Sequence, residues 1–366
     1  MNFSIAREAL LQPLMVVNSV IEKRQTLPIL SNICVKVSNS VMTLTATDLE
    51  VEMSASSALD ESSGNFQTTV PARKLVEITK AAPGGCVISF DVGTDKVKVK
   101  AGRAKFTLSS MDAEEYPIID LGGEASAVVS TNIQLAELLN LTQFAMAQQD
   151  VRYYLNGLFF DLEGSSLTVV GTEGHRLAVA KLEVKNSGGG RQLIVPRKTV
   201  LEMLRLLDHS DDEITLSLGG DHFVFKSGSI IFKSKVIDGT YPDYRRVIPT
   251  AVNNRLVCNR VAMKEVLSRV AILANEKYRA VRFTLRQNSL SISSNNQQNE
   301  EAEEDLDVNY VGADLEIGFN ASYFLDVLSA LKTEDVEFNF GDSNSSCLIL
   351  APGSDNAQYV IMPMRL

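Results

Sequence analysis

Apolar residues along the chain alternate between helical and strand-like spacing, and this succession occurs three times. Segments 132–147 and 260–274 carry apolar residues at the three- and four-residue intervals of an amphipathic helix. Strictly alternating segments also occur in each stretch, including ICVKV from Ile33, LFFDL from Leu158 and VRFTL from Val281. Such alternation is typical of strands that are buried on one face. The pattern therefore predicts an α+β fold in which helices pack against antiparallel sheets.

Three segments align without gaps and indicate an internal repeat. They are FQTTVPARKLVEITKAAPG (66–84), RQLIVPRKTVLEMLRLLDH (191–209) and LEIGFNASYFLDVLSALKT (315–333). A Tyr-Pro pair closes the first two copies, beginning at Tyr116 and at Tyr241. A unit of this length is close to one small domain and too long for a solenoid repeat. The chain is therefore predicted to contain three domains, each of two helices against antiparallel sheets, at 1–125, 126–248 and 249–366.

The second helix of the first two copies carries a basic stripe. Arg73 and Lys80 lie on one helical face with a glutamate between them, and Lys198 and Arg205 occupy the equivalent positions. In the third copy the stripe is replaced by serine and aspartate within 322–329. The stripes are either ordinary solvated faces or a surface for a phosphate backbone. The net charge of −10 argues against a protein that covers nucleic acid with its whole surface.

Composition narrows the class of protein further. Apolar residues make up 45% and charged residues 22% of the chain, as in ordinary folded proteins. No apolar run approaches the ~20 residues of a membrane helix, and the N-terminus lacks the features of a secretory signal. The four cysteines are scattered singly, so they suggest neither a disulfide framework nor a metal site. We expect a cytoplasmic protein without a cofactor or metal.

Two strand segments carry opposite charge. Segment 96–105 contains five basic and no acidic residues, whereas segment 300–307 contains six acidic residues. An edge strand is open to pairing with another chain, and charge can select which partner adds on. The two segments therefore predict head-to-tail association, which closes a ring or grows a filament. Independent solubilising charges are the alternative interpretation.

Two further features bear on function. The chain ends in MPMRL from Met362, which is apolar where a terminus is usually polar and suits an adaptable binding surface. His175 could act as a base, but no serine or cysteine near it in the sequence has the context of a nucleophile. We therefore expect a binding protein rather than an enzyme, and a hydrolase that uses His175 is the weaker hypothesis.

Six ordered segments over the full length resemble the bacterial DNA polymerase III beta subunit, the family of sliding clamps. They are TLPILSN (26–32), QDVRYYLNGL (149–158), EGHRLAV (173–179), YPDYRRVIP (241–249), AILANEK (271–277) and MPMRL (362–366). The resemblance implies a homodimeric ring that encircles and slides on duplex DNA without reading its sequence. It implies a processivity factor without a catalytic site, a cofactor or a membrane association.

The resemblance also implies partners and site residues. The polymerase III alpha subunit, the clamp loader, other polymerases and repair proteins would bind through short hydrophobic motifs in a pocket between the second and third domains. That pocket would use Leu155, Thr172, Gly174, His175, Arg176, Leu177, Pro242, Arg246, Val247, Val360, Met362, Pro363 and Met364. Duplex DNA would contact Arg24, Arg73, Gln149, Tyr153, Tyr154 and Lys198, to which the basic stripe adds Arg197 and Arg205. The dimer joint would use Lys74, Arg103, Lys105, Phe106, Leu108, Ile272, Leu273, Glu300, Glu301 and Glu304.

Two departures from the family pattern are visible. Glu173 stands where the family often has aspartate, and segment 341–358 matches the pattern only loosely. A head-to-tail repeat scaffold that binds peptides without encircling DNA remains the alternative function.

Overall fold

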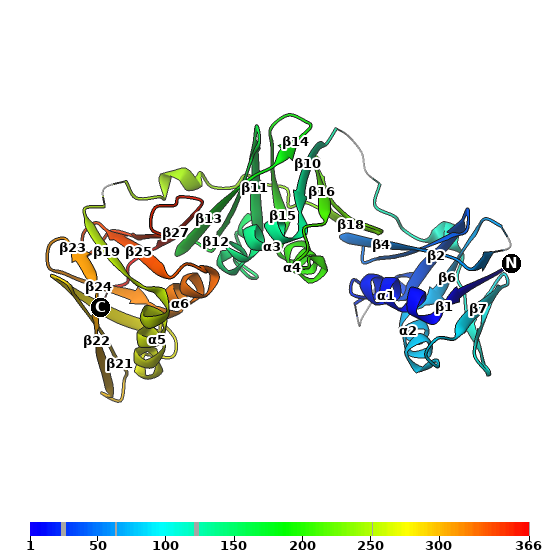
Figure 1. Cartoon of the computed structure of the whole chain (residues 1–366), viewed down its shortest axis with the longest axis horizontal. Coiled ribbons are helices and arrows are strands. Elements are labelled where there is room, and N and C mark those ends of the chain that lie inside the picture. The colour runs from blue at the N-terminus through cyan, green and yellow to red at the C-terminus, as the bar shows by residue number, and fades with distance from the viewer. Residues whose placement is uncertain (23–26, 63, 121–123, 251, 366) are drawn as a thin grey trace. The chain divides into compact units, whose positions relative to one another are not determined.

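A computed structural model describes residues 1–22, 27–62, 64–120, 124–250 and 252–365 (Figure 1). Contacts group the chain into two compact units. The first comprises residues 1–133, 185–189 and 201–236, and the second comprises the remainder. Some residues of the second copy belong to the first unit and the others belong to the second unit. The division into three domains stays a prediction.

The same order of elements recurs three times, which confirms the predicted α+β class. In each copy one strand and one helix precede a group of strands, and a second helix precedes three more strands. The α-helices of the described residues are α1 (Arg7–Asn18), α2 (Ala72–Ala81), α3 (Asn132–Asn140), α4 (Arg197–Leu206), α5 (Arg260–Val270) and α6 (Ala321–Ala330). Short 3-10 turns are η1 (Pro28–Ser31), η2 (Ala113–Glu115), η3 (Gln143–Ala145), η4 (Tyr153–Leu155), η5 (Tyr244–Arg246) and η6 (Ala271–Leu273).

The first unit contains two antiparallel sheets. Its five-stranded sheet runs β5 (Glu61–Ser62), β1 (Asn2–Ala6), β7 (Val87–Val92), β8 (Lys96–Ala101), β9 (Ala104–Ser109). Its nine-stranded sheet runs β14 (Lys185–Asn186), β10 (Ser126–Thr131), β16 (Glu213–Leu218), β17 (His222–Ser227), β18 (Ile230–Lys235), β4 (Val51–Ala58), β3 (Val41–Thr47), β2 (Asn32–Ser38), β6 (Phe66–Pro71). The pairing of β4 with β18 makes one sheet from strands of the first and second copies, with Met53 opposite Phe232.

The second unit repeats this arrangement. Its nine-stranded sheet runs β15 (Arg191–Pro196), β11 (Gly157–Glu163), β12 (Ser166–Thr172), β13 (Arg176–Glu183), β27 (Ala357–Ile361), β26 (Cys347–Leu350), β25 (Asp335–Phe340), β19 (Asn254–Asn259), β23 (Asn309–Val311). Its four-stranded sheet runs β22 (Glu301–Asp307), β21 (Ser289–Asn295), β20 (Ala280–Arg286), β24 (Leu315–Asn320). Here β13 pairs with β27, so that strands of the second and third copies share a sheet, with Leu177 opposite Val360.

Burial follows the alternation that the sequence shows. On β20, Val281, Phe283 and Leu285 are buried, and the residues between them are more exposed. The rings of Phe319 and Phe324 lie 4.9 Å apart and both contact Phe283, so that α6 is held on this sheet by aromatic packing. Helix α6, which follows the strands of this sheet in sequence, therefore covers part of its apolar face.

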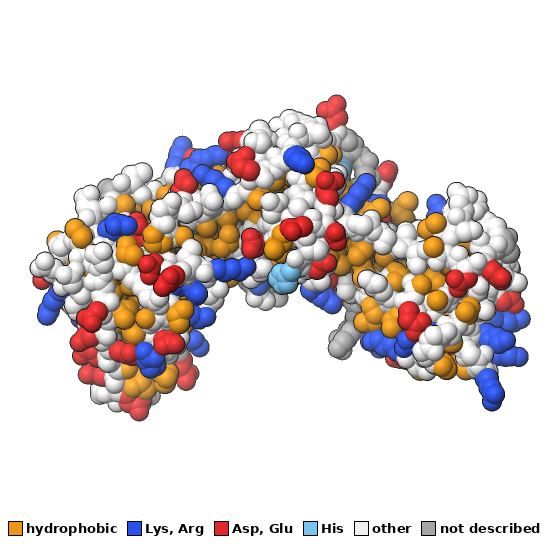
Figure 2. Space-filling view, in the orientation of Figure 1, with side chains coloured by type: hydrophobic (Ala, Val, Ile, Leu, Met, Phe, Trp, Pro, Cys, Tyr) orange, Lys and Arg blue, Asp and Glu red, His pale blue; other side chains and the backbone are white. Residues whose placement is uncertain are grey.

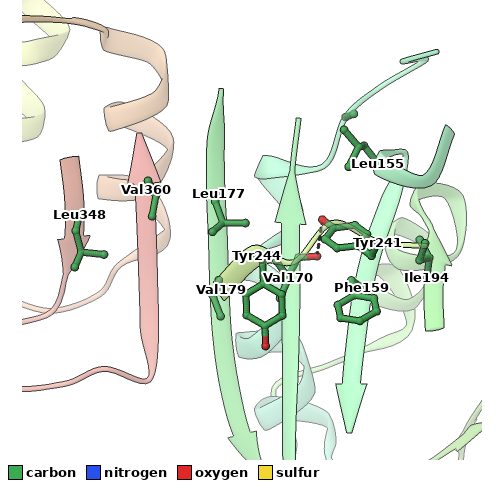
Figure 3. Packing of buried hydrophobic residues seen from close by; sticks show 11 residues of the cluster. Leu155, Phe159, Val170, Leu177, Val179, Ile194, Tyr241, Tyr244, Leu348 and Val360 are labelled. Carbon is green, nitrogen blue, oxygen red and sulfur yellow. Dashed lines mark hydrogen bonds between the residues drawn. The ribbon is translucent and has the colours of Figure 1, made fainter. Parts of the chain in front are cut away.

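The Tyr-Pro segment of the second copy is fixed to the large sheet of the second unit (Figure 3). The Tyr241 ring stacks on Phe159 at 4.8 Å, and its hydroxyl donates to the Val170 carbonyl at 3.4 Å. Asp161, only 1% exposed, accepts hydrogen bonds from the Tyr244 hydroxyl at 3.3 Å and from the Arg245 guanidinium at 2.9 Å. A buried carboxylate is stable only with such partners, so these contacts hold the segment in one position.

The Tyr244 contact predicts a specific loss of stability at alkaline pH. Burial raises the pKa of Tyr244 to about 12 from an ordinary value of 10.0. The folded state therefore favours the protonated phenol, and this contribution to stability is present below pH ~10 and is lost as pH rises through about 12. We expect the urea midpoint of a Tyr244→Phe variant to fall less steeply over this interval than that of the unaltered chain.

Tyr153→Phe is the matched control, because the Tyr153 side chain is 58% exposed. Its urea midpoint should fall with the same slope as that of the unaltered chain. Equal slopes for all three proteins would show that Tyr244 does not titrate as stated.

Candidate functional site

A cavity of about 140 Å³ opens in the second unit, beside the junction of β13 and β27. Ten of the thirteen residues predicted for the pocket line it: Leu155, Thr172, Gly174, His175, Arg176, Leu177, Pro242, Val247, Val360 and Met362. Arg152 and Tyr154, which sequence reasoning did not assign to the pocket, complete the lining. Both lie within QDVRYYLNGL (149–158), so the resembling segment contained the signal that could have found them.

The floor of the cavity is apolar and its rim is exposed. Leu177 and Val360 face one another across paired strands and are almost fully buried (Figure 3). Val247 and Met362 stand at the rim with 39% and 41% of their surface exposed. The Met362 amide donates to the His175 carbonyl at 3.0 Å, which sets the end of β27 against the opposite wall. Exposed apolar side chains above an apolar floor suit a short hydrophobic ligand.

One wall is a tight turn that requires glycine. The Thr172 hydroxyl donates to the Arg176 carbonyl at 2.6 Å and accepts from the Gly174 amide at 3.1 Å. Gly174 has a φ of +98°, and a Cβ there would meet the Arg152 guanidinium at 2.8 Å. A side chain at this position would therefore be strained and would displace Arg152.

Arg152 is held over this turn by its neighbours. Its guanidinium binds both carboxylate oxygens of Asp150, at 3.0 and 2.8 Å, and donates to the Glu173 carbonyl at 2.9 Å. Its hydrogen bond lowers the pKa of the Asp150 carboxyl to about 2, so that this carboxylate stays ionised at neutral pH. The bidentate pair gives Arg152 a defined orientation at the mouth of the cavity.

Arg176 connects the pocket to helix α6. Its guanidinium bonds the Asp326 carboxylate at 2.6 Å and the Phe144 carbonyl at 2.7 Å, and it lies 4.6 Å from the Tyr323 ring centroid. The Tyr323 hydroxyl donates in turn to Glu173 at 3.4 Å. Arg176 therefore ties together elements of the second and third copies. The glutamate that departs from the family pattern takes part in the same network.

Three residues predicted for the pocket are not among those that line the cavity. Arg246 is 85% exposed and pairs with Asp243 at 2.9 Å. Met364 donates its amide to the Gly318 carbonyl at 2.8 Å and borders a different cavity next to Tyr278. Pro363, between Met362 and Met364, is half-buried. The chain turns away after Met362 because Met364 bridges to β24.

The described residues predicted to contact DNA lie on helix α2, on helix α4 and in segment 149–154, which leads into η4. Arg73 is exposed on α2, whose opposite face buries Leu75 and Ile78. Arg197 and Lys198 begin α4 and are half-buried, and the Arg205 guanidinium bonds Glu202 at 3.0 Å. Gln149 and Tyr153 are exposed, and Tyr154 is half-buried with its ring edge-on to Tyr153 at 5.8 Å. Arg24 lies outside the described residues.

Most of the residues predicted for a dimer joint lie on or beside end strands, and Lys74 lies on α2. Strand β9 ends its sheet in the first unit and carries Lys105, Phe106 and Leu108, and Arg103 precedes it. Strand β22 ends its sheet in the second unit and carries Glu301 and Glu304, and Glu300 precedes it. Basic side chains gather around β7–β9 and acidic ones around β21 and β22 (Figure 2).

Exposed apolar side chains accompany these charges. Ile272 is 75% exposed, Leu273 is half-buried beside it, and Phe106 is 37% exposed. Leu108 is buried within its own sheet, and Lys74 is exposed on α2. Glu304 already has a partner in its own chain, because the Arg269 guanidinium bonds both of its carboxylate oxygens at 2.9 and 2.7 Å.

Two further observations on the described residues concern metal binding and membrane-spanning helices. No group of three or more His, Cys, Asp or Glu side chains in the described ranges is placed to hold a metal ion. None of the described helices is long and apolar enough to cross a membrane.

Comparisons with known proteins assign the family. The N-terminal, central and C-terminal domain models of the DNA polymerase III beta subunit match residues 1–120, 130–243 and 245–365. The chain is 46% identical to the beta sliding clamp of Pseudomonas aeruginosa and 44% identical to that of Escherichia coli K12, with 100% of each chain covered.

Solved structures give the same result. A Pseudomonas aeruginosa sliding clamp bound to griselimycin superposes with a TM-score of 0.96 at 46% identity, and a Caulobacter crescentus clamp with 0.94 at 34% identity. Each comparison covers 100% of both chains. The chain belongs to the DNA polymerase III beta subunit family, the bacterial sliding clamps.

Proposed function

We propose that this chain is a DNA polymerase processivity factor of the cytoplasm. Two chains close a ring that encircles and slides on duplex DNA, and a hydrophobic pocket tethers polymerase III and other partners to it. The observation that carries the proposal is the full-length similarity to beta sliding clamps, in sequence and in fold. The protein has no catalytic site of its own, and His175 belongs to the rim of the pocket.

The strand pairing within the chain supports closure of a ring. Strand β4 of the first copy pairs with β18 of the second, and β13 of the second pairs with β27 of the third. In the order of elements, β22 of the third copy holds the place that β4 and β13 hold in the first and second copies. Likewise, β9 of the first copy holds the place of β18 and β27 in the later copies. These two strands end their sheets within the described chain. If β9 of one chain pairs with β22 of the other chain, the joint between chains repeats the strand pairing that joins neighbouring copies within a chain.

Charge and apolar contact favour this joint. Exposed Arg103, Lys105 and Lys74 would meet Glu300 and Glu301, since Glu304 is bound by Arg269 of its own chain. Ile272 and Leu273 would pack beside Phe106. Burial of exposed apolar side chains supplies most of the free energy of association, and complementary charge selects the orientation.

The basic residues of α2 and α4 support non-specific DNA binding. Arg73, Arg197, Lys198 and Arg205 would approach phosphates, which carry no sequence information. The exposed Tyr153 side chain would add a flat surface. Because the chain as a whole is acidic, DNA is excluded from the remaining surface.

The cavity beside β13 and β27 is proposed to receive the hydrophobic motifs of the polymerase III alpha subunit, the clamp loader, other polymerases and repair proteins. Its apolar floor and polar turn fit a short peptide. Solved clamps of Pseudomonas aeruginosa and Bartonella birtlesii are bound to griselimycin, a ligand that supports a binding pocket in this family. A repeat scaffold that does not encircle DNA is not favoured, because the full-length relatives are sliding clamps.

Encirclement predicts binding that depends on DNA topology. The chain, loaded onto nicked circular duplex DNA by a clamp loader, should remain with the circle during gel filtration. It should be lost after a restriction enzyme cuts the circle, because a ring slides off a free end. Linear DNA blocked at both ends by bound streptavidin is the control and should retain the chain. Equal loss from intact and cut circles would reject encirclement.

The proposed joint predicts monomers when its apolar side chains are shortened. The double variant Ile272→Ala, Leu273→Ala should shift the mass seen by light scattering from two chains to one chain of 40.0 kDa. Each truncation removes about 1–3 kcal/mol of apolar burial. Val311→Ala is the control, because Val311 is 69% exposed on β23, which belongs to the other sheet of the second unit and carries none of the proposed joint residues. A dimer that survives the double variant at micromolar concentration would contradict this joint.

The pocket predicts weaker partner binding when its rim becomes charged. Val247→Asp should reduce affinity for the polymerase III alpha subunit by about tenfold or more, since a carboxylate would be desolvated against an apolar motif. Surface plasmon resonance measures the change. Val151→Asp, at a position 95% exposed and outside the cavity lining, should bind as the unaltered chain does. Similar losses in both variants would assign the effect to net charge and count against the pocket.

A further inference from the structure

The first copy contains the same turn that forms a wall of the peptide pocket in the second copy. The Thr47 hydroxyl donates to the Val51 carbonyl at 2.7 Å and accepts from the Leu49 amide at 3.1 Å. Thr172 makes the equivalent two bonds in the second copy. The Lys235 amide donates to the Glu50 carbonyl at 2.9 Å, in the way that Met362 closes the later pocket. We call this set of three hydrogen bonds, made around Thr172 and Met362 in the later pocket, the pocket frame. The same frame is present around Thr47 and Lys235.

A cavity of about 290 Å³ lies in this first frame, entirely within the first unit. Pro117 lines it, as Pro242 of the second Tyr-Pro pair lines the later pocket. Ile118 and Ile119 follow Pro117 on the same wall. The two cavities thus have corresponding walls, a threonine turn on one side and a Tyr-Pro segment on the other.

Leu49 is the most unusual residue of this cavity. Its φ is +79°, where the second copy has Gly174 at +98°. A leucine in this conformation costs about 1–2 kcal/mol relative to an ordinary backbone, and such strain persists most often at functional sites. The side chain is 37% exposed at the cavity, and Ile118 nearby is 72% exposed. Two large apolar side chains therefore stand open to solvent at one rim.

The positions that form the floor of the later pocket differ in the first copy. Where the second copy pairs Leu177 with Val360, the first places Glu52 opposite Lys233 on β4 and β18. Their charged groups lie 2.8 Å apart, and Glu52 is only 3% exposed. Glu52 accepts from the Ile119 amide at 2.7 Å, and Lys233 donates to the Ile119 carbonyl at 3.2 Å. This buried ion pair fixes the backbone of Ile119, which lines the cavity, so the apolar floor of the later pocket has no counterpart here.

Charge on the wall indicates which ligand fits. Asp120 and Asp221 line the cavity against one ammonium group, that of Lys235. The His222 ring bonds the Asp221 carboxylate at 2.7 Å and lowers the pKa of that carboxyl, and the Asp221 side chain remains 82% exposed. The cavity therefore combines an apolar rim with an excess of carboxylate.

We propose that this cavity is a second docking site, for a short peptide segment that carries an apolar side chain next to a lysine or arginine. The apolar side chain contacts Leu49 and Ile118, and the cation lies between Asp120 and Asp221. The inference goes beyond the proposed function and rests on it only in taking the shared frame as a peptide-binding frame. The two cavities then select different partners, the later one through its apolar floor and this one through the carboxylates of its wall.

Methyl NMR of the intact chain tests the proposal with two synthetic peptides, acetyl-Leu-Phe-Arg-amide and acetyl-Leu-Phe-Glu-amide. The Arg peptide should shift the methyl signals of Leu49 and Ile118, and the Glu peptide should bind about fivefold or more weakly. The methyl signals of Leu177 and Val360 report the other pocket in the same spectra. A failure of either site is therefore visible separately.

Two variants decide the outcome. Asp120→Asn with Asp221→Asn should remove the preference for Arg over Glu, and Leu49→Asn, which tolerates the left-handed backbone, should weaken binding of the Arg peptide while leaving thermal stability unchanged or higher. The proposal is overturned if Leu49 and Ile118 do not shift at millimolar Arg peptide. It is also overturned if both peptides bind equally, or if the Asn variants bind as the unaltered chain does.

Discussion

The architecture depends on one constraint, that an exposed strand edge must find a partner. Strands β4 and β13 would each end their own half-sheet, and each is completed by a strand of the next copy, β18 or β27. Backbone hydrogen bonds across these junctions join the copies more firmly than side-chain contacts alone could. The same rule leaves β9 and β22 as end strands. A chain of three such copies thus carries two end strands of opposite charge, which supports the proposed association of two chains.

The cavity beside β13 and β27 lies at the same kind of junction. Where β27 joins β13, the last strand brings Val360 and Met362 against the turn at Thr172, and the Tyr-Pro segment closes the side. The buried Asp161 holds that segment through Tyr244 and Arg245. Arg176 fastens the junction from the other side through Asp326. The cavity is therefore lined by residues that also join two copies.

Repetition gives the chain several equivalent positions and lets each diverge. The frame around Thr47 keeps the hydrogen bonds of the frame around Thr172, but a Glu52–Lys233 ion pair replaces the apolar floor. The basic positions of α2 and α4 become Ser322 and Ser329 in α6, and Asp326, which stands where α2 and α4 carry glutamate, binds Arg176. Equivalent exposed positions can thus differ in charge between copies, because the fold is maintained by the buried faces.

The α+β class, the threefold succession of elements and the second helices followed from the sequence alone. Hydrophobic period is set locally by which side of a helix or strand is buried, and the ungapped alignment of 66–84, 191–209 and 315–333 places a second helix in each copy. The resembling segments also named most of the residues that line the cavity, including Leu177, Pro242 and Val360. Only the tertiary structure decided that Arg152 and Tyr154 line the cavity, that Met364 turns away to β24, and that Glu304 is bound by Arg269. These outcomes depend on the register between strands far apart in the chain and on competition for charged partners, and neither is encoded in local spacing.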